Sequence, residues 1–94
     1  MTITIRVPSA LRSYSDGASE LLLPSTSAAT VRAALAHLEG AHSELYRSVC
    51  DETGAVRRHV NVFVNASLVH GAEGLDTPLA PGDVVAIFQA VSGG

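Results

Sequence analysis

The residues best suited to chemistry in this sequence are its last two, Gly93 and Gly94. Glycine has no Cβ, so a Gly-Gly end adopts nearly any backbone conformation and passes through a channel too narrow for other side chains. A terminal glycine also leaves its carboxylate sterically open to activation. The alternative interpretation is a frayed end without a function.

The other reactive residue types form no catalytic or metal-binding pattern. The four histidines, at positions 37, 42, 59 and 70, lack the short spacings of a zinc site, and no cysteine pair completes one. Cys50 is the single cysteine, and its sequence neighbours supply no positive charge that would activate a thiol. No serine or cysteine lies in a nucleophile-elbow motif. We therefore expect no catalytic residue, no bound metal and no cofactor of the protein's own.

Length and composition indicate one globular domain spanning residues 1–94. Hydrophobic residues make up 47% of the 94 and charged residues 16%, yet no apolar run approaches the roughly 18 residues of a membrane span. The alternating start, Met1 to Arg6, is unlike a secretory signal. The net charge of −3 does not indicate the positively charged surface that binds nucleic acid or an anionic membrane. We expect a cytoplasmic protein that is monomeric when free.

Two strands and a helix are predicted in the first half of the chain. Apolar and polar residues alternate over 2–7, which is the period of a strand with one buried face. Residues 20–23 predict a second strand that pairs with the first as a hairpin across a long loop. Apolar residues recur at helical spacing over 31–39, behind Thr30 as N-cap and before Gly40 as C-cap.

The second half predicts two further strands. Residues 43–49 are expected to form a turn or a short helix, and valines alternate with other residues in a strand over 60–64. Residues 66–73 are expected to be a loop, and 75–81 a connecting turn. The final strand spans 84–88, with Ala86 and Phe88 on its outward face.

The order strand, strand, helix, strand, strand predicts an α+β fold, in which a mixed sheet of four to five strands is crossed on one face by one main helix. If the first and last strands lie side by side at the centre, they run parallel and the helix supplies a right-handed crossover. This arrangement is the ubiquitin-like β-grasp. It would send the last strand out of the sheet into a flexible tail over about residues 89–94.

The stretch LAPGDVVAIFQAVSGG at the end of the chain combines a Gly82-Asp83 turn, an apolar strand and a small-residue tail ending in Gly-Gly. In these features the chain resembles the ubiquitin-like sulfur carriers of the ThiS/MoaD family. Upstream, RHVNVFVN is similar to the third strand of the CysO-type carriers, which serve cysteine biosynthesis. Molybdopterin-type relatives often carry Pro-Pro before the tail, where this chain has Gln89-Ala90.

The resemblance implies a carrier rather than an enzyme. An E1-like enzyme would use ATP to adenylate the Gly94 carboxylate, and a sulfur donor would displace AMP to leave a thiocarboxylate. Val91, Ser92 and Gly93 would lead Gly94 into the active site of that enzyme. In CysO-type systems the sulfur would attack an aminoacrylate on a pyridoxal-phosphate-dependent cysteine synthase, and a zinc hydrolase would trim the adduct. ATP and the other cofactors thus belong to the partners.

A docking surface for such a partner is predicted from two aromatic residues. Phe63 and Phe88 point outward from strands that are neighbours in a β-grasp sheet, and adjacent exposed aromatics are typical of an interface. We expect Phe63, Ala86 and Phe88 to form the patch that the activating enzyme contacts. The alternative is that the loop at 66–73 covers one of the rings.

Several functions remain compatible with the sequence. The sulfur acceptor is selected by the partner, so a molybdopterin precursor, thiazole or a sulfur-containing secondary metabolite is the alternative to cysteine biosynthesis. A ubiquitin-like modifier, which forms isopeptide bonds with lysines, would use the same adenylation and the same tail. A binding module with an incidental tail is the last alternative.

Overall fold

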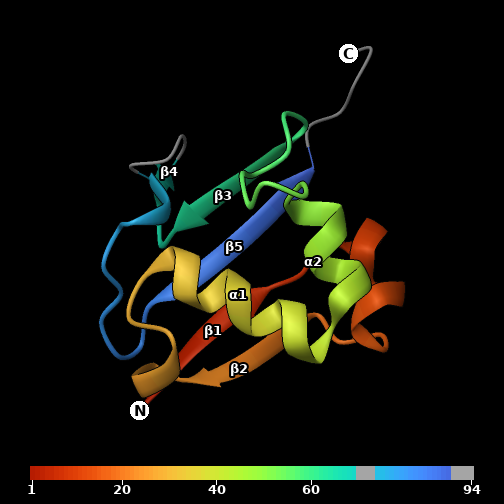
Figure 1. Ribbon diagram of the computed structural model, residues 1–94. Helices are drawn as coiled ribbons and strands as arrows, with labels where there is room; N and C mark the ends of the chain where they lie inside the picture. The colour runs from red at the N-terminus through yellow and green to blue at the C-terminus, as the bar shows by residue number, and fades with distance from the viewer. Residues whose placement is uncertain (70–73, 90–94) are drawn as a thin grey trace.

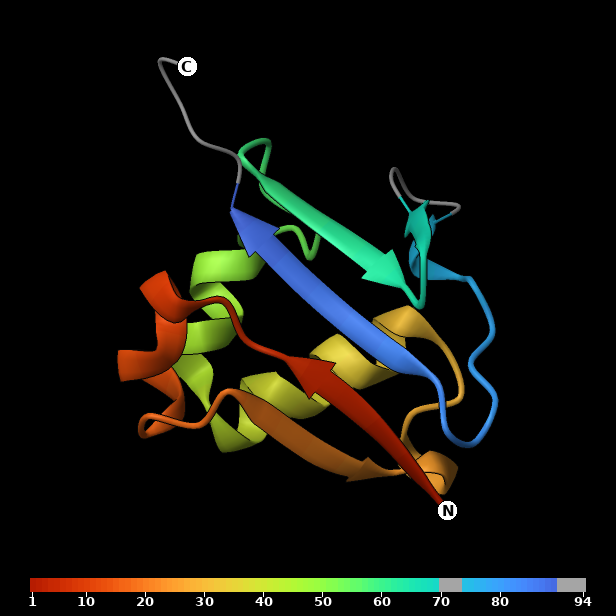
Figure 2. The ribbon, with the colours of Figure 1, turned by 180° about the vertical axis from the view of Figure 1, so that it is seen from behind.

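The structure is a computed structural model that describes residues 1–69 and 74–89. A five-stranded sheet forms one layer, and the helices pack on one face of it, while no helix of the described residues covers the other face (Figures 1 and 2). The strands are β1 (Thr2–Arg6), β2 (Glu20–Pro24), β3 (Val60–Val64), β4 (Ser67–Val69) and β5 (Val84–Gln89). The α-helices are α1 (Val31–Ala41) and α2 (Ser43–Val49), and the 3₁₀ helices are η1 (Ser9–Ser15) and η2 (Ser25–Ser27).

The strand order is β2-β1-β5-β3-β4, with β1 and β5 parallel at the centre and the other pairs antiparallel. Parallel neighbours need a long crossover, and the segment between β2 and β3 that contains α1 and α2 crosses the sheet on one face. The central parallel pair and the mixed sheet confirm the predicted α+β architecture.

The core lies between the sheet and the helices. The inward residues of the two central strands, Ile3, Ile5, Val85 and Ile87, are at most 1% exposed. Helix α1 buries a stripe at helical spacing against them, made by Val31, Ala34, Leu35 and Leu38. The Oγ1 atom of Thr30 accepts a hydrogen bond from the Ala33 amide at 3.1 Å, which confirms the predicted N-cap.

The predicted C-cap at Gly40 is wrong. Helix α1 continues through Gly40 to Ala41, and the His42 amide donates to the Leu38 carbonyl at 2.7 Å. Gly40 does not have a positive φ, and a Cβ there would meet nothing within 4 Å. Packing of the buried stripe therefore extends the helix across a residue that disfavours it only by about 1 kcal/mol.

The loop predicted over 66–73 contains a strand. Asn65 has a φ of 55° and begins a tight turn with Ala66, after which β4 returns antiparallel to β3. Asparagine is one of the few residues that tolerate this left-handed conformation, and it is typical of hairpin turns. Residues 70–73 lie outside the described part of the chain. The segment over 9–15, which has no helical pattern, forms η1.

The Gly82-Asp83 turn connects β5 to both neighbouring strands. Gly82 has a φ of 93°, a conformation that glycine adopts without strain, and its amide donates to the Thr2 carbonyl at 2.8 Å. The Asp83 carboxylate accepts from the Ala80 amide at 2.9 Å and from the Asn65 side-chain amide at 3.2 Å. These bonds join the turn before β5 to the turn after β3.

Substitution of Asp83 should reduce stability in a pH-dependent way. The hydrogen bonds from Ala80 and Asn65 lower the pKa of Asp83. A carboxyl whose pKa is lower in the folded protein stabilises the fold above its unfolded pKa of about 3.9, and this contribution is lost as pH falls through the folded pKa. Asp83→Ala should thus lower the free energy of unfolding at neutral pH, and urea titrations should show the difference from wild type shrinking in acid. A pH-independent difference would contradict this assignment.

Candidate functional site

Strand β5 carries the chain from the middle of the sheet toward the predicted tail. Its inward residues Val85 and Ile87 are buried, and its last residue, Gln89, pairs with Val60 of β3. The strand is therefore one residue longer than the sequence pattern predicted, and the tail has its base at a central, doubly paired strand. The predicted tail residues Val91, Ser92, Gly93 and Gly94 lie outside the described residues.

The two aromatic residues predicted to face outward lie on the sheet face opposite the helices. The ring centroids of Phe63 and Phe88 are 5.4 Å apart and the ring planes meet at 89°, which is the edge-to-face geometry that aromatic pairs favour. Phe88 is 52% exposed, and Phe63 is half-buried. The sheet thus brings together two rings that are 25 residues apart in sequence.

Ala86 lies on the same face, as predicted, but it offers a partner little surface. It pairs with Phe63 on one side and with Arg6 on the other, and it is only 7% exposed. Its short side chain lies lower than its large neighbours and forms part of the floor of a shallow depression that Phe63, Val84 and Phe88 also line. The expectation that Ala86 points outward is confirmed, while contact with a partner must come mainly from the rings.

Leu68 was missed by sequence reasoning. It pairs with Phe63 across β3 and β4 and is 49% exposed on the same face. The missing signal was the Asn65-Ala66 turn, which would have placed Leu68 beside Phe63. We call the resulting surface the open-face patch, and it comprises Phe63, Leu68, Val84, Ala86 and Phe88.

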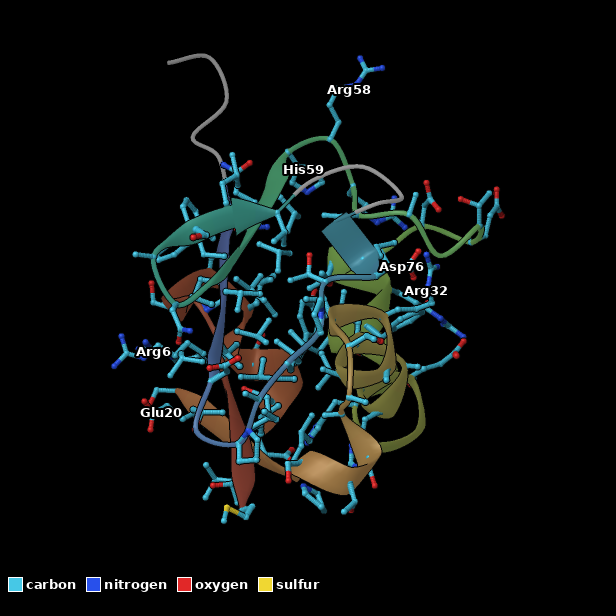
Figure 3. All side chains as sticks on the ribbon, turned by 90° about the vertical axis from the view of Figure 1, so that its left-hand side faces the viewer. Arg6, Glu20, Arg32, Arg58, His59 and Asp76 are labelled. Atoms are coloured by element: carbon cyan, nitrogen blue, oxygen red, sulfur yellow. The ribbon has the colours of Figure 1, made fainter. Side chains whose placement is uncertain are left out.

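A charged pair borders the open-face patch. Arg6 pairs with Ala86 in the ladder, and its Nε lies 3.3 Å from the Oε2 atom of Glu20 on β2 (Figure 3). Both side chains are about half-exposed or more, so the pair contributes little to stability. An apolar centre with a charged margin is the common anatomy of a protein interface.

Arginine side chains lie on both sides of the last residues of β5. Arg6 and Arg12 line a second depression together with Phe88. On the other side, Arg58 lies two residues before Val60, the partner of Gln89, and is exposed at that end of the molecule (Figure 3). Glu20 lines the same depression and pairs with Arg6, so Arg12 and Arg58 are the arginines near the end of β5 that a carboxylate of a partner could meet.

Cys50 is buried and unsuited to nucleophilic chemistry. It is 2% exposed, and burial, followed by the negative charge of Asp51, raises its pKa to about 11. The thiol is therefore protonated at neutral pH. This environment confirms the interpretation of Cys50 as a packing residue.

The described residues have neither a metal-binding cluster nor a membrane-spanning helix. Residues 1–69 and 74–89 contain no group of three or more histidine, cysteine, aspartate or glutamate side chains placed to hold a metal ion. Within the same residues, every helix is too short or too polar to cross a membrane.

The chain matches one protein family along nearly its entire length. The model of the ThiS family matches residues 5–94, a range that includes the terminal Gly-Gly. The sulfur carrier protein CysO of Mycobacterium tuberculosis is 34% identical over 96 residues, and the match covers 100% of both chains.

Solved structures agree with this match. The crystal structure of Mycobacterium tuberculosis CysO has a TM-score of 0.82 at 31% identity and covers 95% of this chain and 99% of its own. A chain in the Amycolatopsis orientalis BexX/CysO complex has a TM-score of 0.84 at 28% identity, with 98% and 99% covered. SAMP1, the small archaeal modifier protein 1 of Haloferax volcanii, has a TM-score of 0.81 at 30% identity, with 100% of both chains covered. These similarities and the strand order confirm the predicted β-grasp fold.

Proposed function

This chain belongs to the ThiS family, and from that membership we propose that it is a cytoplasmic sulfur carrier of the CysO type, acted on by partner enzymes. The observation that carries the proposal is the full-length match, which extends through Gly94. The resemblance drawn from the C-terminal stretch is thereby confirmed. The lack of a nucleophilic environment around Cys50 is consistent with a carrier whose chemistry takes place at its own C-terminus.

The proposed reaction activates the Gly94 carboxylate. A carboxylate is a poor electrophile, so an E1-like partner first transfers AMP from ATP to it, releasing pyrophosphate. A sulfide equivalent then attacks the acyl carbon and expels AMP, leaving a thiocarboxylate. A thiocarboxylate is ionised at neutral pH and is a strong nucleophile. The carrier supplies the acyl group, and ATP is consumed by the partner.

We propose that the sulfur enters cysteine biosynthesis, because the chain is similar to the sulfur carrier protein CysO and resembles the CysO-type carriers. The sulfur would add to an aminoacrylate held by a pyridoxal-phosphate-dependent synthase, and a zinc hydrolase would release the product. The acceptors named as alternatives use the same thiocarboxylate and differ only in the enzyme that receives it. The CysO chain in complex with BexX supports docking to a partner enzyme as the way in which such a carrier works.

The docking surface proposed for the activating enzyme is the open-face patch. Phe88 lies one residue before the end of β5, so an enzyme that holds its ring also holds the base of the tail. The edge-to-face contact with Phe63 fixes the orientation of both rings before binding, which reduces the entropy lost on association. Leu68 widens the apolar surface, and the Arg6–Glu20 pair limits it on the other side.

The double substitution Phe63→Ala with Phe88→Ala should weaken binding to the activating enzyme about 10- to 100-fold, because aromatic anchors carry much of the energy of an interface. The free energy of unfolding should fall by only about 1 kcal/mol, since one ring is exposed and the other half-buried. Titration calorimetry measures the affinity. Leu22→Ala is the control, because Leu22 is 67% exposed on the same face but lies on β2, where it pairs with Thr4. Full affinity in the double variant would refute the patch.

Intact mass spectrometry tests the carrier function. The 94-residue protein is incubated with ATP, an E1-like enzyme and sulfide, and a gain of about 16 Da, for one oxygen replaced by sulfur, is expected. Omission of ATP should prevent the gain. No ATP-dependent change with an enzyme that binds the chain would contradict the proposed function.

A protein modifier is the second candidate function. It is favoured by the similarity to small archaeal modifier protein 1 of Haloferax volcanii, which covers 96% of this chain at a TM-score of 0.79. In that function the activated Gly94 carbonyl would be attacked by a lysine of another protein. Conjugates heavier by the mass of this chain, formed in place of the small mass gain, would distinguish it from the carrier.

A further inference from the structure

The chain contains no lysine. All six of its permanently basic residues are arginines, so the N-terminal amine of Met1 is the only primary amine in the 94 residues. Guanidinium groups stay protonated and do not act as nucleophiles at physiological pH. Only one amine of this chain could therefore react with an activated carboxyl group at Gly94.

An activated acyl group reacts with any amine that reaches it. In an acyl adenylate, the amine nitrogen attacks the Gly94 carbonyl carbon, the C–O bond to AMP breaks, and the amine loses a proton. The products are an amide, AMP and a proton. When the amine belongs to the same copy the protein is cyclised, and when it belongs to another copy the two become linked. Both reactions would remove the carboxylate that carries the sulfur.

The single amine lies at the wrong end of the sheet for the first of these reactions. Thr4 pairs with Val84 in the parallel ladder, and Met1 lies three residues before Thr4, while Gln89 lies five residues after Val84. At a strand rise of about 3.3 Å, Met1 and Gln89 are about 26 Å apart. Figures 1 and 2 show the N-terminus and the end of β5 at opposite ends of the molecule.

The residues after Gln89 are too few to span this distance. Five residues follow Gln89, and even a fully extended chain of five reaches at most about 18 Å. Cyclisation onto Met1 therefore fails by about 8 Å. The other strong nucleophile, the thiol of Cys50, is 2% exposed in the core and cannot meet the carbonyl without unfolding.

We propose that this protein is unable to accept its own activated end, so that it neither cyclises nor builds lysine-linked chains of itself. Within one copy the activated end therefore meets no amine, and the group that receives it is a sulfur nucleophile or an amine of another molecule. This inference rests on the proposed activation of Gly94. It also restricts the modifier function, because conjugates would carry single copies on each acceptor lysine and no chains linked through the carrier's own lysines.

A chemical thioester tests the inference without an activating enzyme. The full chain is prepared with a C-terminal thioester at Gly94, as a stand-in for the adenylate, and followed by intact mass at about 10 µM and mildly alkaline pH. The wild type should yield only the hydrolysed acid. The effective concentration of a group tethered by a short linker is in the millimolar range, about a hundredfold above this protein concentration, so intramolecular acylation is readily distinguished.

Arg58→Lys places an amine within reach of the carbonyl. Position 58 is two residues from Val60, the partner of Gln89, and therefore lies within about 13 Å of Gln89. The variant should form a cyclised product about 18 Da lighter than the acid, through loss of water relative to that acid, at a rate independent of protein concentration.

Thr26→Lys is the matched control. Thr26 is exposed in η2, next to Ser25, whose amide donates to the Met1 carbonyl, so the new amine lies at the far end of the sheet. This variant should hydrolyse like the wild type. Cyclised or linked wild-type protein at the rate of Arg58→Lys would overturn the inference. Hydrolysis alone in Arg58→Lys would overturn it too, because a nearby lysine would then be harmless. Neither outcome bears on whether a partner enzyme activates Gly94.

Discussion

Deletion of Gly94 is expected to abolish the ATP-dependent mass gain and leave the fold unchanged. The shortened chain still ends in a glycine carboxylate at residue 93, but its reach is shorter by about 3.5 Å. A misplacement of 1 Å at a reacting centre can cost about a hundredfold in rate, so no thiocarboxylate should be detected within the time that the wild type needs for full conversion.

Stability of the deletion variant should equal that of the wild type. Among the described residues, the hydrophobic core extends from Ile3 to Ile87, and β5 ends at Gln89. Thermal unfolding followed by circular dichroism measures this, and Thr26→Ala, an exposed change in η2 that leaves the tail intact, is the control that should retain the mass gain. A deletion variant that still gains sulfur would refute Gly94 as the site.

Leu38→Ala is expected to produce the largest loss of stability, about 2 to 5 kcal/mol in the free energy of unfolding. Leu38 is 0% exposed on the inner stripe of α1, where its side chain fills space between the helix and the sheet. A leucine-to-alanine change there loses apolar burial and leaves a cavity. The free energy of unfolding of a domain of this size is about 5 to 10 kcal/mol in total. The variant should therefore lose a large share of its stability.

Leu22→Ala removes the same atoms from the surface. Leu22 lies on the open face of β2 and is 67% exposed, so the change should be within about 0.5 kcal/mol of the wild type. Urea titrations of both variants give the comparison. Equal losses in the two variants would show that α1 is not packed on the sheet as described.

Local patterns predicted the elements that bury a periodic face. The alternation around Ile3 and Ile5 and the helical spacing of Leu35 and Leu38 each report burial directly, and the structure confirms both. Gly40 was misjudged because glycine is common at helix ends, whereas here tertiary packing carries the helix past it.

The open-face patch was predicted only in part. Phe63 and Phe88 were recognisable because each stands at an outward position of a well-formed strand. Leu68 was not, because β4 is three residues long and its pairing with β3 depends on a turn whose backbone conformation is not a periodic signal. The low exposure of Ala86 depends on neighbours from two other strands.

The sequence alone determined the residue types that the proposed chemistry depends on: a Gly-Gly end, a Gly-Asp turn before an apolar strand, and a complete lack of lysine. The tertiary structure determined how far apart these residues lie. It places β1 and β5 side by side and parallel, so that Met1 and the base of the tail lie at opposite ends of one sheet, and it brings Phe63, Leu68 and Phe88 onto one face. Pairing between strands far apart in sequence sets these distances, because it depends on the packing of the whole core.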